Sequence, residues 1–456
     1  MRGWTQTFVL AVDVLWLSSS LGSAQQLSDA QIDIIVQNLA VGATHSWEFG
    51  TRSQSLIELN SHAFNVLNTS FKLPPSHSAP SSLFDVLHIA DETILNRTAE
   101  VANASEFPAP QPFFPGDTST ADPSSMGVAI LIANWTGMGN SSVDYAGAAQ
   151  SEIEFLFSDA VRKTSDGAFS HRTDQLQLWS DFTYMVPPFL AYYGVMNANS
   201  SMVEEAYTQI KLYRNYLRDT NASNLWRHVV MGNGTDPGHW STGNAWAAAG
   251  MLRVLGTIKN SQFAKSMKNE QTDLTNWVKE IHNAMYSHIR SDNLFYNYAD
   301  DNSTFADASS AALLAATVYR MSLLTNTHTH LPQAEKVRKT LSSPSTSSGS
   351  GSGTNPNSLA GMLHFTSDGW LTPVVDPLSV GVSGQKSPEG QAFVVQMHAA
   401  WQDWVAQGSK GANAARRTAS DLPSTSVVAL WSAFVASLSG GLWGGRAHTP
   451  PVKERD

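Results

Sequence analysis

The clearest indication of the fold class is the segment His239-Trp240-Ser241-Thr242-Gly243-Asn244-Ala245-Trp246-Ala247-Ala248-Ala249-Gly250. Gly243-Asn244 suits the entry to a helix. Trp246, Gly250 and Val254 then recur at every fourth position, which places them on one face of that helix. The small residues among them let a neighbouring helix approach closely. The stretch therefore predicts a helix packed tightly inside a larger helical assembly.

Helical periodicity continues on both sides of this stretch. Ser28 caps a run with an apolar face, and Ser387-Pro388-Glu389 is a helix start with proline at the first helical position. We predict further helices over 52–67, 83–99, 148–161, 183–195, 201–217, 243–258, 272–289, 307–324 and 425–437. Because alternating strand patterns are scarce, we predict an all-α fold. A repeated helix–loop–helix unit of this kind suits a helical toroid.

The composition narrows the class of protein. Apolar residues make up 42% and charged residues 14%, and the chain has 14 Trp and 19 Phe. Such a chain can bury a large core and still line a groove with aromatic rings. It has no cysteine, so core burial alone must stabilise it. The net charge of −10 argues against a nucleic-acid partner, which would need a basic surface.

The N-terminus predicts secretion. Arg2, the apolar residues 8–12 and 14–17, and Gly22-Ser23-Ala24 have the order of a signal peptide over residues 1–24. Nine Asn-x-Ser/Thr sequons support an extracellular location, at Asn68, Asn96, Asn103, Asn134, Asn140, Asn199, Asn221, Asn233 and Asn302. No later run approaches the length of a membrane span, so we expect no membrane partner.

Asp181 is the leading candidate for chemistry. It follows Trp179 and precedes the apolar run Phe182–Leu190. A carboxyl among such neighbours resists ionisation, so its pKa should rise and it could donate a proton near neutrality. Trp179 could stack on the apolar face of a sugar. The alternative is that Asp181 only caps the following helix.

Other segments carry weaker signals. Trp240 and Trp246 flank a turn and could line a sugar cleft, or belong to the core. Asp144 opens a helix, where capping is the commoner explanation, and Glu389 could simply favour a helix dipole. His328 and His330 lie in a Thr-rich loop without an acidic partner, so we predict no metal site and no cofactor.

Six segments follow one another along the chain. They are Val143-Asp144-Tyr145-Ala146-Gly147, Asp166-Gly167-Ala168-Phe169-Ser170-His171, Trp179-x-Asp181, Trp240-x-x-Gly243-Asn244-x-Trp246, Asp307-Ala308-Ser309-Ser310-Ala311 and Ser387-Pro388-Glu389-Gly390-Gln391-Ala392-Phe393. Together, in this order, they resemble glycoside hydrolase families 105 and 88, the unsaturated rhamnogalacturonyl and glucuronyl hydrolases. The resemblance implies an (α/α)6 barrel, a six-hairpin toroid, with a cleft at one end. It implies a single catalytic domain over 25–445. Composition, independently of the resemblance, predicts a flexible Ser/Gly insertion at 342–357 and a charged tail at 446–456.

The resemblance also implies a reaction and its residues. In these families a catalytic Asp protonates the C4=C5 double bond of a terminal unsaturated uronic acid, water adds at C5, and the resulting hemiketal opens. Asp181 matches the general acid/base and Asp144 a second important Asp. Trp179, His228, Trp240, Trp246 and the position of Thr242 match residues of the cleft. The implied partner is an acidic, pectin-type oligosaccharide.

Two positions depart from the family pattern. Thr242 stands where the family has an Arg suited to a uronate carboxylate, and Asp144-Tyr145 stands where it has Asp-Asp. Two alternatives therefore stay open. One is a conventional glycosidase on the same barrel, acting on a saturated uronide or another glycan. The other is a non-catalytic glycan-binding protein.

Overall fold

The computed structural model describes residues 25–68, 70, 72–78, 80–103, 110–345 and 355–412. The predicted signal peptide, the helix over 425–437, the tail 446–456 and residues 346–354 of the insertion lie outside this part. Within it are twelve α-helices: α1 (Asp29–Gly42), α2 (Ser46–Asn60), α3 (Phe84–Asn103), α4 (Gly127–Thr136), α5 (Tyr145–Phe157), α6 (Phe182–Met196), α7 (Ser200–Leu217), α8 (Ser241–Asn260), α9 (Lys268–Tyr286), α10 (Ala308–Thr325), α11 (Leu331–Leu341) and α12 (Pro388–Ala406).

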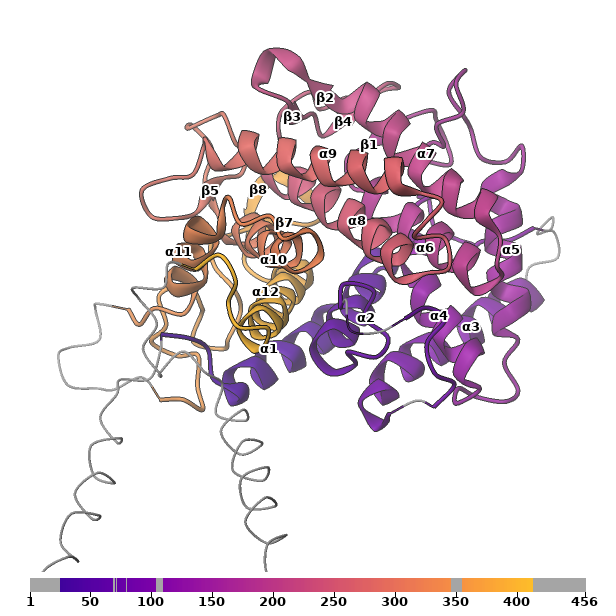
Figure 1. Cartoon of the computed structure of the whole chain (residues 1–456), viewed down its shortest axis with the longest axis horizontal. Helices are drawn as coiled ribbons and strands as arrows, with labels where there is room; N and C mark the ends of the chain where they lie inside the picture. The colour runs from indigo at the N-terminus through magenta and orange to yellow at the C-terminus, as the bar shows by residue number, and fades with distance from the viewer. Residues whose placement is uncertain are drawn as a thin grey trace, which may run out of the picture. The chain divides into compact units, whose positions relative to one another are not determined.

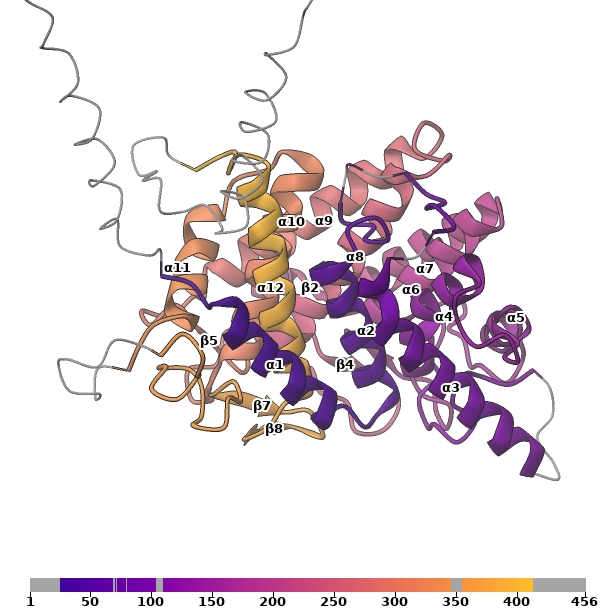
Figure 2. The same ribbon diagram turned by 90° about the horizontal axis from the view of Figure 1, so that it is seen from below.

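The helices form two concentric rings (Figures 1 and 2). The even-numbered helices are the inner ring, in which α2, α4, α6, α8, α10 and α12 each pack against the next, and α12 packs against α2. The odd-numbered helices lie outside, with α1 on α12, α3 and α5 on α4, α7 on α6, α9 on α8 and α11 on α10. This arrangement confirms the predicted all-α (α/α)6 barrel.

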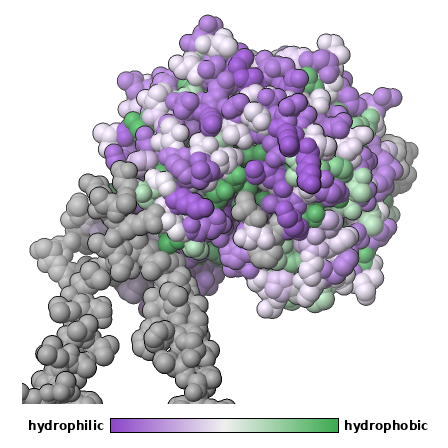
Figure 3. Space-filling model, in the orientation of Figure 1, coloured by the Kyte–Doolittle hydropathy of each residue, from purple (hydrophilic) through white to green (hydrophobic). Residues whose placement is uncertain are grey.

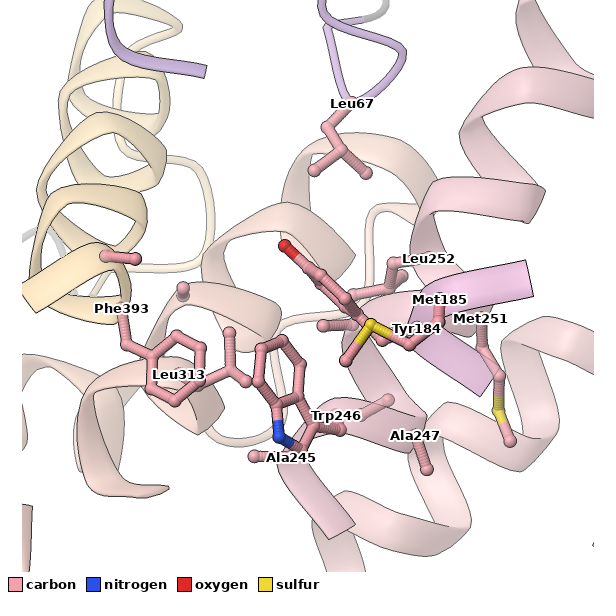
Figure 4. Close-up of a cluster of buried hydrophobic side chains, with 14 of the residues drawn as sticks. Leu67, Tyr184, Met185, Ala245, Trp246, Ala247, Met251, Leu252, Leu313 and Phe393 are labelled. Carbon is pink, nitrogen blue, oxygen red and sulfur yellow. The ribbon is translucent and has the colours of Figure 1, made fainter. Parts of the chain in front are cut away.

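The two rings differ in their patterns of burial. Nearly every residue of α8 is buried, whereas α9 buries one stripe that includes Leu274, Val278, Ile281 and Met285. Trp246 of α8 lies 4.3 Å from the ring of Tyr184 on α6 and 4.7 Å from that of Phe393 on α12, centroid to centroid. Figure 4 shows this packing at the junction of the inner helices.

Three helices differ from the sequence prediction. Helix α2 begins at Ser46 rather than 52, because its buried face carries polar side chains, among them Glu48, Gln54 and Glu58, and so lacks an apolar period. Helix α4 was not predicted because almost all of it is apolar and buried, so it shows no amphipathic contrast. Helix α11 was not predicted either, because it has only 11 residues and follows the Thr- and His-rich loop.

Helix α6 contains Pro187 and Pro188, and α8 compensates for the second of them. Proline has no N–H, so Pro188 leaves the carbonyl of Tyr184 without its helical partner. The buried Arg253 of α8 supplies one, since its Nη1 donates to Tyr184 O at 3.0 Å. Beside it, Gly250 lies so close that an added Cβ would be 2.0 Å from the carbonyl oxygen of Thr183. The tight helix packing predicted around Gly250 is therefore a contact with the backbone of α6.

Short antiparallel pairs gather at one end of the barrel. They are β1 (Leu178–Trp179) with β4 (Val229–Val230), β2 (Arg218–Asp219) with β3 (Leu225–Trp226), β5 (Phe295–Tyr296) with β6 (Ala306–Asp307), and β7 (Val374–Asp376) with β8 (Ser379–Gly384). Strand β1 leads into α6, β6 into α10, and β8 into α12. Figure 2 shows β7 and β8 at the N-terminal end of α12. The N-terminal ends of the inner helices therefore share one face with these hairpins.

Most of the described sequon asparagines lie at the surface, where an acceptor of an N-linked glycan has to lie. The face in Figure 3 is largely hydrophilic, with hydrophobic residues gathered near its middle. The sequon asparagines are exposed at 96, 134, 140, 199, 221, 233 and 302 and partly exposed at 68, while the side chain of Asn103 lies outside the described part. Among the described helices, none has both the length and the apolar character needed to cross a membrane.

Candidate functional site

A cavity of about 490 Å³ opens at the end of the barrel that carries the hairpins. Six of the residues predicted from the sequence line it: Trp179, Asp181, His228, Trp240, Thr242 and Trp246. A second hollow of about 470 Å³ lies along α9, but its acid, Glu280, is paired with Arg214 and Arg218. The first cavity is therefore the candidate functional site.

The pairing of β1 with β4 brings the central residues together. Trp179 lies opposite Val229, and the backbone N–H of Ser180 donates to His228 O at 2.9 Å. The rings of Trp179 and His228 then meet edge to face at 5.4 Å, and Trp240 lies 4.6 Å from His228 on another side. Segments about 50 residues apart thus converge beside Asp181.

Asp181 points into this cavity and does not cap α6. It occupies the N-cap position, but its side chain accepts no capping hydrogen bond. Its Oδ2 accepts from Ser180 Oγ at 2.9 Å and lies 3.7 Å from His228 Nε2, and the side chain is 16% exposed. Burial raises the pKa of Asp181, and the neighbouring His228 and Ser180 only partly offset this. The carboxyl can therefore hold a proton to a higher pH than an ordinary aspartate.

A hydrogen bond to Asp236 orients the ring of His228. Its Nδ1–H donates to Asp236 Oδ2 at 2.9 Å, and Tyr298 Oη donates to the same oxygen at 2.6 Å. Burial is the largest single influence and raises the pKa of Asp236, but the hydrogen bonds from His228, Tyr298 and Gly238 N and the electrostatic effect of His228 together outweigh it and leave that pKa lowered. With Nδ1 as donor to Asp236, His228 presents its other nitrogen, Nε2, toward Asp181. That Nε2 is buried and has no hydrogen-bond partner among the residues that the structure describes.

Asp122 is a second acid of the cavity that the sequence interpretation missed. It begins a short 3-10 helix (Asp122–Met126) that leads into α4, and it lies 3.5 Å from Nε2 of His171. Burial, Asp117 and Asp181 all raise the pKa of Asp122 well above its usual range. Its sequence signal resembles that of Asp181, since both acids precede an apolar inner helix, but the short 3-10 helix separates Asp122 from α4.

Asp144 lies elsewhere. It caps α5, where its Oδ1 accepts from Gly147 N at 2.8 Å, and it is not among the residues that line the cavity. The contacts of Asp144 in the structure are therefore those of a helix cap. The described acids that line the cavity with Asp181 are Asp122, Asp236 and Glu389.

Glu389 is another carboxyl in the cavity, at the start of α12. Trp47 Nε1 donates to its Oε1 and Ser387 Oγ to its Oε2. Burial, and then the neighbouring Glu48, raise the pKa of Glu389 to about 7. These hydrogen bonds fix the Glu389 carboxyl in the wall of the cavity, so its position is not explained by the helix dipole alone.

Thr242 gives the cavity no free polar group. Its hydroxyl donates to Asp307 Oδ2 at 2.8 Å, and Asp307 in turn caps α10. Trp240 and Trp246 are 5% and 2% exposed, so each belongs to the core and lines the cavity at the same time. Arg172 supplies the positive charge that Thr242 lacks. Among the described residues that line the cavity, it is the only arginine or lysine.

Comparisons with known proteins identify the family of the chain. The sequence model of Glycosyl Hydrolase Family 88 matches residues 101–365, more than half of the chain. No curated protein sequence matches it. A possible member of family GH105 from Klebsiella pneumoniae is 15% identical, covers 88% of this chain and 98% of its own, and has a TM-score of 0.59.

Two further solved structures share the fold. A possible GH105 member from Salmonella enterica is 16% identical, covers 82% of this chain and 92% of its own, and has a TM-score of 0.58. An unsaturated glucuronyl hydrolase responsible for the degradation of glycosaminoglycan, from a Bacillus species, is 14% identical. It covers 84% of this chain and 96% of its own, and has a TM-score of 0.50.

Proposed function

Because the chain belongs to glycoside hydrolase family 88, we propose that it releases a terminal unsaturated uronic acid from acidic oligosaccharides, with Asp181 as the general acid and base. The observation that carries the proposal is the environment of Asp181. Its carboxyl is largely buried in a cavity with tryptophan walls, has a raised pKa, and faces an unpaired imidazole nitrogen. A proton donor that is also shielded from bulk water suits the protonation of a carbon atom.

The reaction needs only this chain's own groups and water. Protonated Asp181 gives its proton to C4, and the positive charge that develops at C5 is shared with the ring oxygen. Water adds at C5 and loses a proton to the Asp181 carboxylate, which regenerates the acid. The hemiketal at C5 opens to a ketone, and the hemiacetal left at C1 then releases the leaving alcohol. The anomeric carbon is not attacked.

Arg172 is proposed to hold the uronate carboxylate, because a guanidinium pairs with a carboxylate through two charge-assisted hydrogen bonds. Its Nε now contacts the exposed Asp174 at 3.2 Å. We expect Arg172→Gln to lower kcat/KM by about tenfold or more for a free uronide, and by less than about threefold for its methyl ester. Steady-state kinetics on both substrates measure this. Equal losses on the two would argue against Arg172 as the carboxylate-binding residue.

The second acid gives a paired test. Asp122 lines the cavity, whereas Asp144 caps a helix outside it. We expect Asp122→Asn to lower kcat by about tenfold or more. Asp144→Asn should change kcat by less than about twofold and leave the free energy of unfolding nearly unchanged, because an asparagine oxygen caps a helix about as well as an aspartate oxygen does. Kinetics and urea denaturation of both variants measure this. The reverse order of effects on kcat would return the role of second acid to Asp144.

The pH profile has a predicted sign. A general acid acts only while protonated, so kcat/KM should fall as pH rises through the raised pKa of Asp181. Glu389, with a pKa of about 7 in the same cavity, could cause the same decline. Profiles of the native chain and of Glu389→Gln separate the two. The basic limb should persist in Glu389→Gln, and its disappearance would assign the limb to Glu389.

The direct test of the function uses products of polysaccharide lyases. Unsaturated disaccharides absorb in the ultraviolet through the C4=C5 bond, and this absorbance disappears when water adds. We expect loss of absorbance with pectin-type disaccharides and release of the free second sugar. Unchanged absorbance with disaccharides from several lyase digests would refute the double-bond mechanism.

A second candidate function follows from the same cavity. Asp122 and Asp181 interact electrostatically within it, and two facing carboxylates are what a conventional glycosidase needs. Hydrolysis of a saturated 4-nitrophenyl uronide, without turnover of the unsaturated disaccharide, would establish this alternative.

We also propose that the protein acts outside the cell, on the strength of the leader sequence and the exposed sequons. Expression in a eukaryotic secretory host should place it in the medium. Peptide N-glycosidase should then lower its apparent mass.

A further inference from the structure

The exposed part of the cavity wall is concentrated on one hairpin. Of the described residues that line the cavity, four are exposed: Leu378, Ser379 and Gly381 on the β7–β8 hairpin and Gly234 in the loop after β4. Along the hairpin the exposure rises from Val375, which is 3% exposed, to Leu378, which is 67% exposed. The hairpin thus runs from the floor of the cavity to its mouth.

The mouth is where a leaving group must lie. The proposed substrate is cleaved at a terminal sugar, and the acid that acts on this sugar, Asp181, is only 16% exposed. The sugar's substituent at C1 therefore has to extend from the interior toward solvent. The hairpin supplies most of the exposed rim that it would pass, and there the side chain of Leu378 is an uncovered apolar surface.

The hairpin is fixed relative to the aromatic wall. Asn297, which is fully buried, donates from Nδ2 to Val380 O at 2.6 Å, and its Oδ1 accepts from Trp240 Nε1 at 3.1 Å. One amide therefore joins the hairpin to a tryptophan that lines the cavity. The base of the hairpin is held as well, since Val375 N donates to Asp307 Oδ1 at 3.3 Å. This wall is set in place before any ligand arrives, which favours binding.

We propose that the β7–β8 hairpin forms the leaving-group subsite, and that Leu378 selects leaving groups that present an apolar face. This proposal rests on the proposed function of the cavity. Ser379 beside Leu378 adds a hydroxyl at the rim, so the preferred group is a sugar or aglycone with one apolar and one polar side. Asn297 is a positioning residue, because it sets the distance between the hairpin and Trp240.

The chain contains a matched control for Leu378. Val382 belongs to the same hairpin and is 52% exposed, but it does not line the cavity. Both Leu378→Asn and Val382→Asn replace an exposed apolar side chain with the same polar one. Only the first alters the wall of the cavity.

The test compares two substrates with the same unsaturated uronic acid, the 4-nitrophenyl glycoside and the methyl glycoside. We expect Leu378→Asn to lower kcat/KM for the 4-nitrophenyl glycoside by about tenfold and for the methyl glycoside by less than about twofold. Val382→Asn should leave both values unchanged. Equal losses on both glycosides, or the same loss in Val382→Asn, would overturn the proposal.

Binding gives a readout that does not require turnover. The dissociation constants of both glycosides can be followed by the fluorescence of the tryptophans in the cavity. If neither glycoside is turned over, the proposed function fails, but a preference in binding that is lost in Leu378→Asn alone would still support the subsite. An unchanged ratio of dissociation constants in Leu378→Asn would refute it.

Discussion

Asp181→Asn is expected to lower kcat for the release of unsaturated uronic acid by about 10²- to 10⁴-fold. The amide has the shape of the carboxyl and keeps its place beside Ser180 and His228, but it has no acidic proton to give to C4. KM should change little, because few contacts to the bound sugar are lost. Single-turnover and steady-state kinetics with an unsaturated disaccharide measure both quantities.

The stability of Asp181→Asn serves as the control. Burial raises the pKa of Asp181, so near neutral pH the folded state tolerates its charged form poorly. A neutral amide removes this cost, and the variant should unfold at the same urea concentration as the native chain or at a higher one. A variant that is fully folded and retains more than about a tenth of native kcat would show that another group supplies the proton.

Gly250→Ala is expected to have the largest effect on folding. The added Cβ would lie 2.0 Å from the carbonyl oxygen of Thr183 and 2.8 Å from Cα of Tyr184, and both of these are backbone atoms of α6. Because no side chain can turn away to make room, α6 and α8 must separate. This would also pull Arg253 from the Tyr184 carbonyl that Pro188 leaves unpaired. We expect a loss of about 3 kcal/mol or more in the free energy of unfolding, or an insoluble protein.

Gly116→Ala is the matched control for this substitution. No atom lies within 4 Å of a Cβ built at Gly116. Its unfolding midpoint in urea should stay close to that of the native chain. If Gly250→Ala proved as stable as Gly116→Ala, the contact between α6 and α8 would be looser than the structure shows, and Gly250 would not be essential to it.

Spacing and local composition predicted most of the helices and the candidate acid Asp181. Positions four apart share a helix face whatever the tertiary structure, so the stripe of α9 and the close approach at Gly250 could be predicted from spacing. The setting of Asp181 was also local, because Trp179 and the apolar start of α6 are its neighbours in the chain. Helices without amphipathic contrast could not be found this way, which is why α4 was missed.

Which other charged groups join Asp181 depends on how the helices close into a ring. Asp122, Arg172, Glu389 and the β7–β8 hairpin come from four separate segments, and each reaches the cavity because the inner ring closes and turns its helix N-termini toward one end. Asp144 has as strong a local signal as Asp122, yet it caps an outer helix away from that end. Periodicity sets which way a side chain faces on its own helix, whereas the closure of the ring sets which side chains meet.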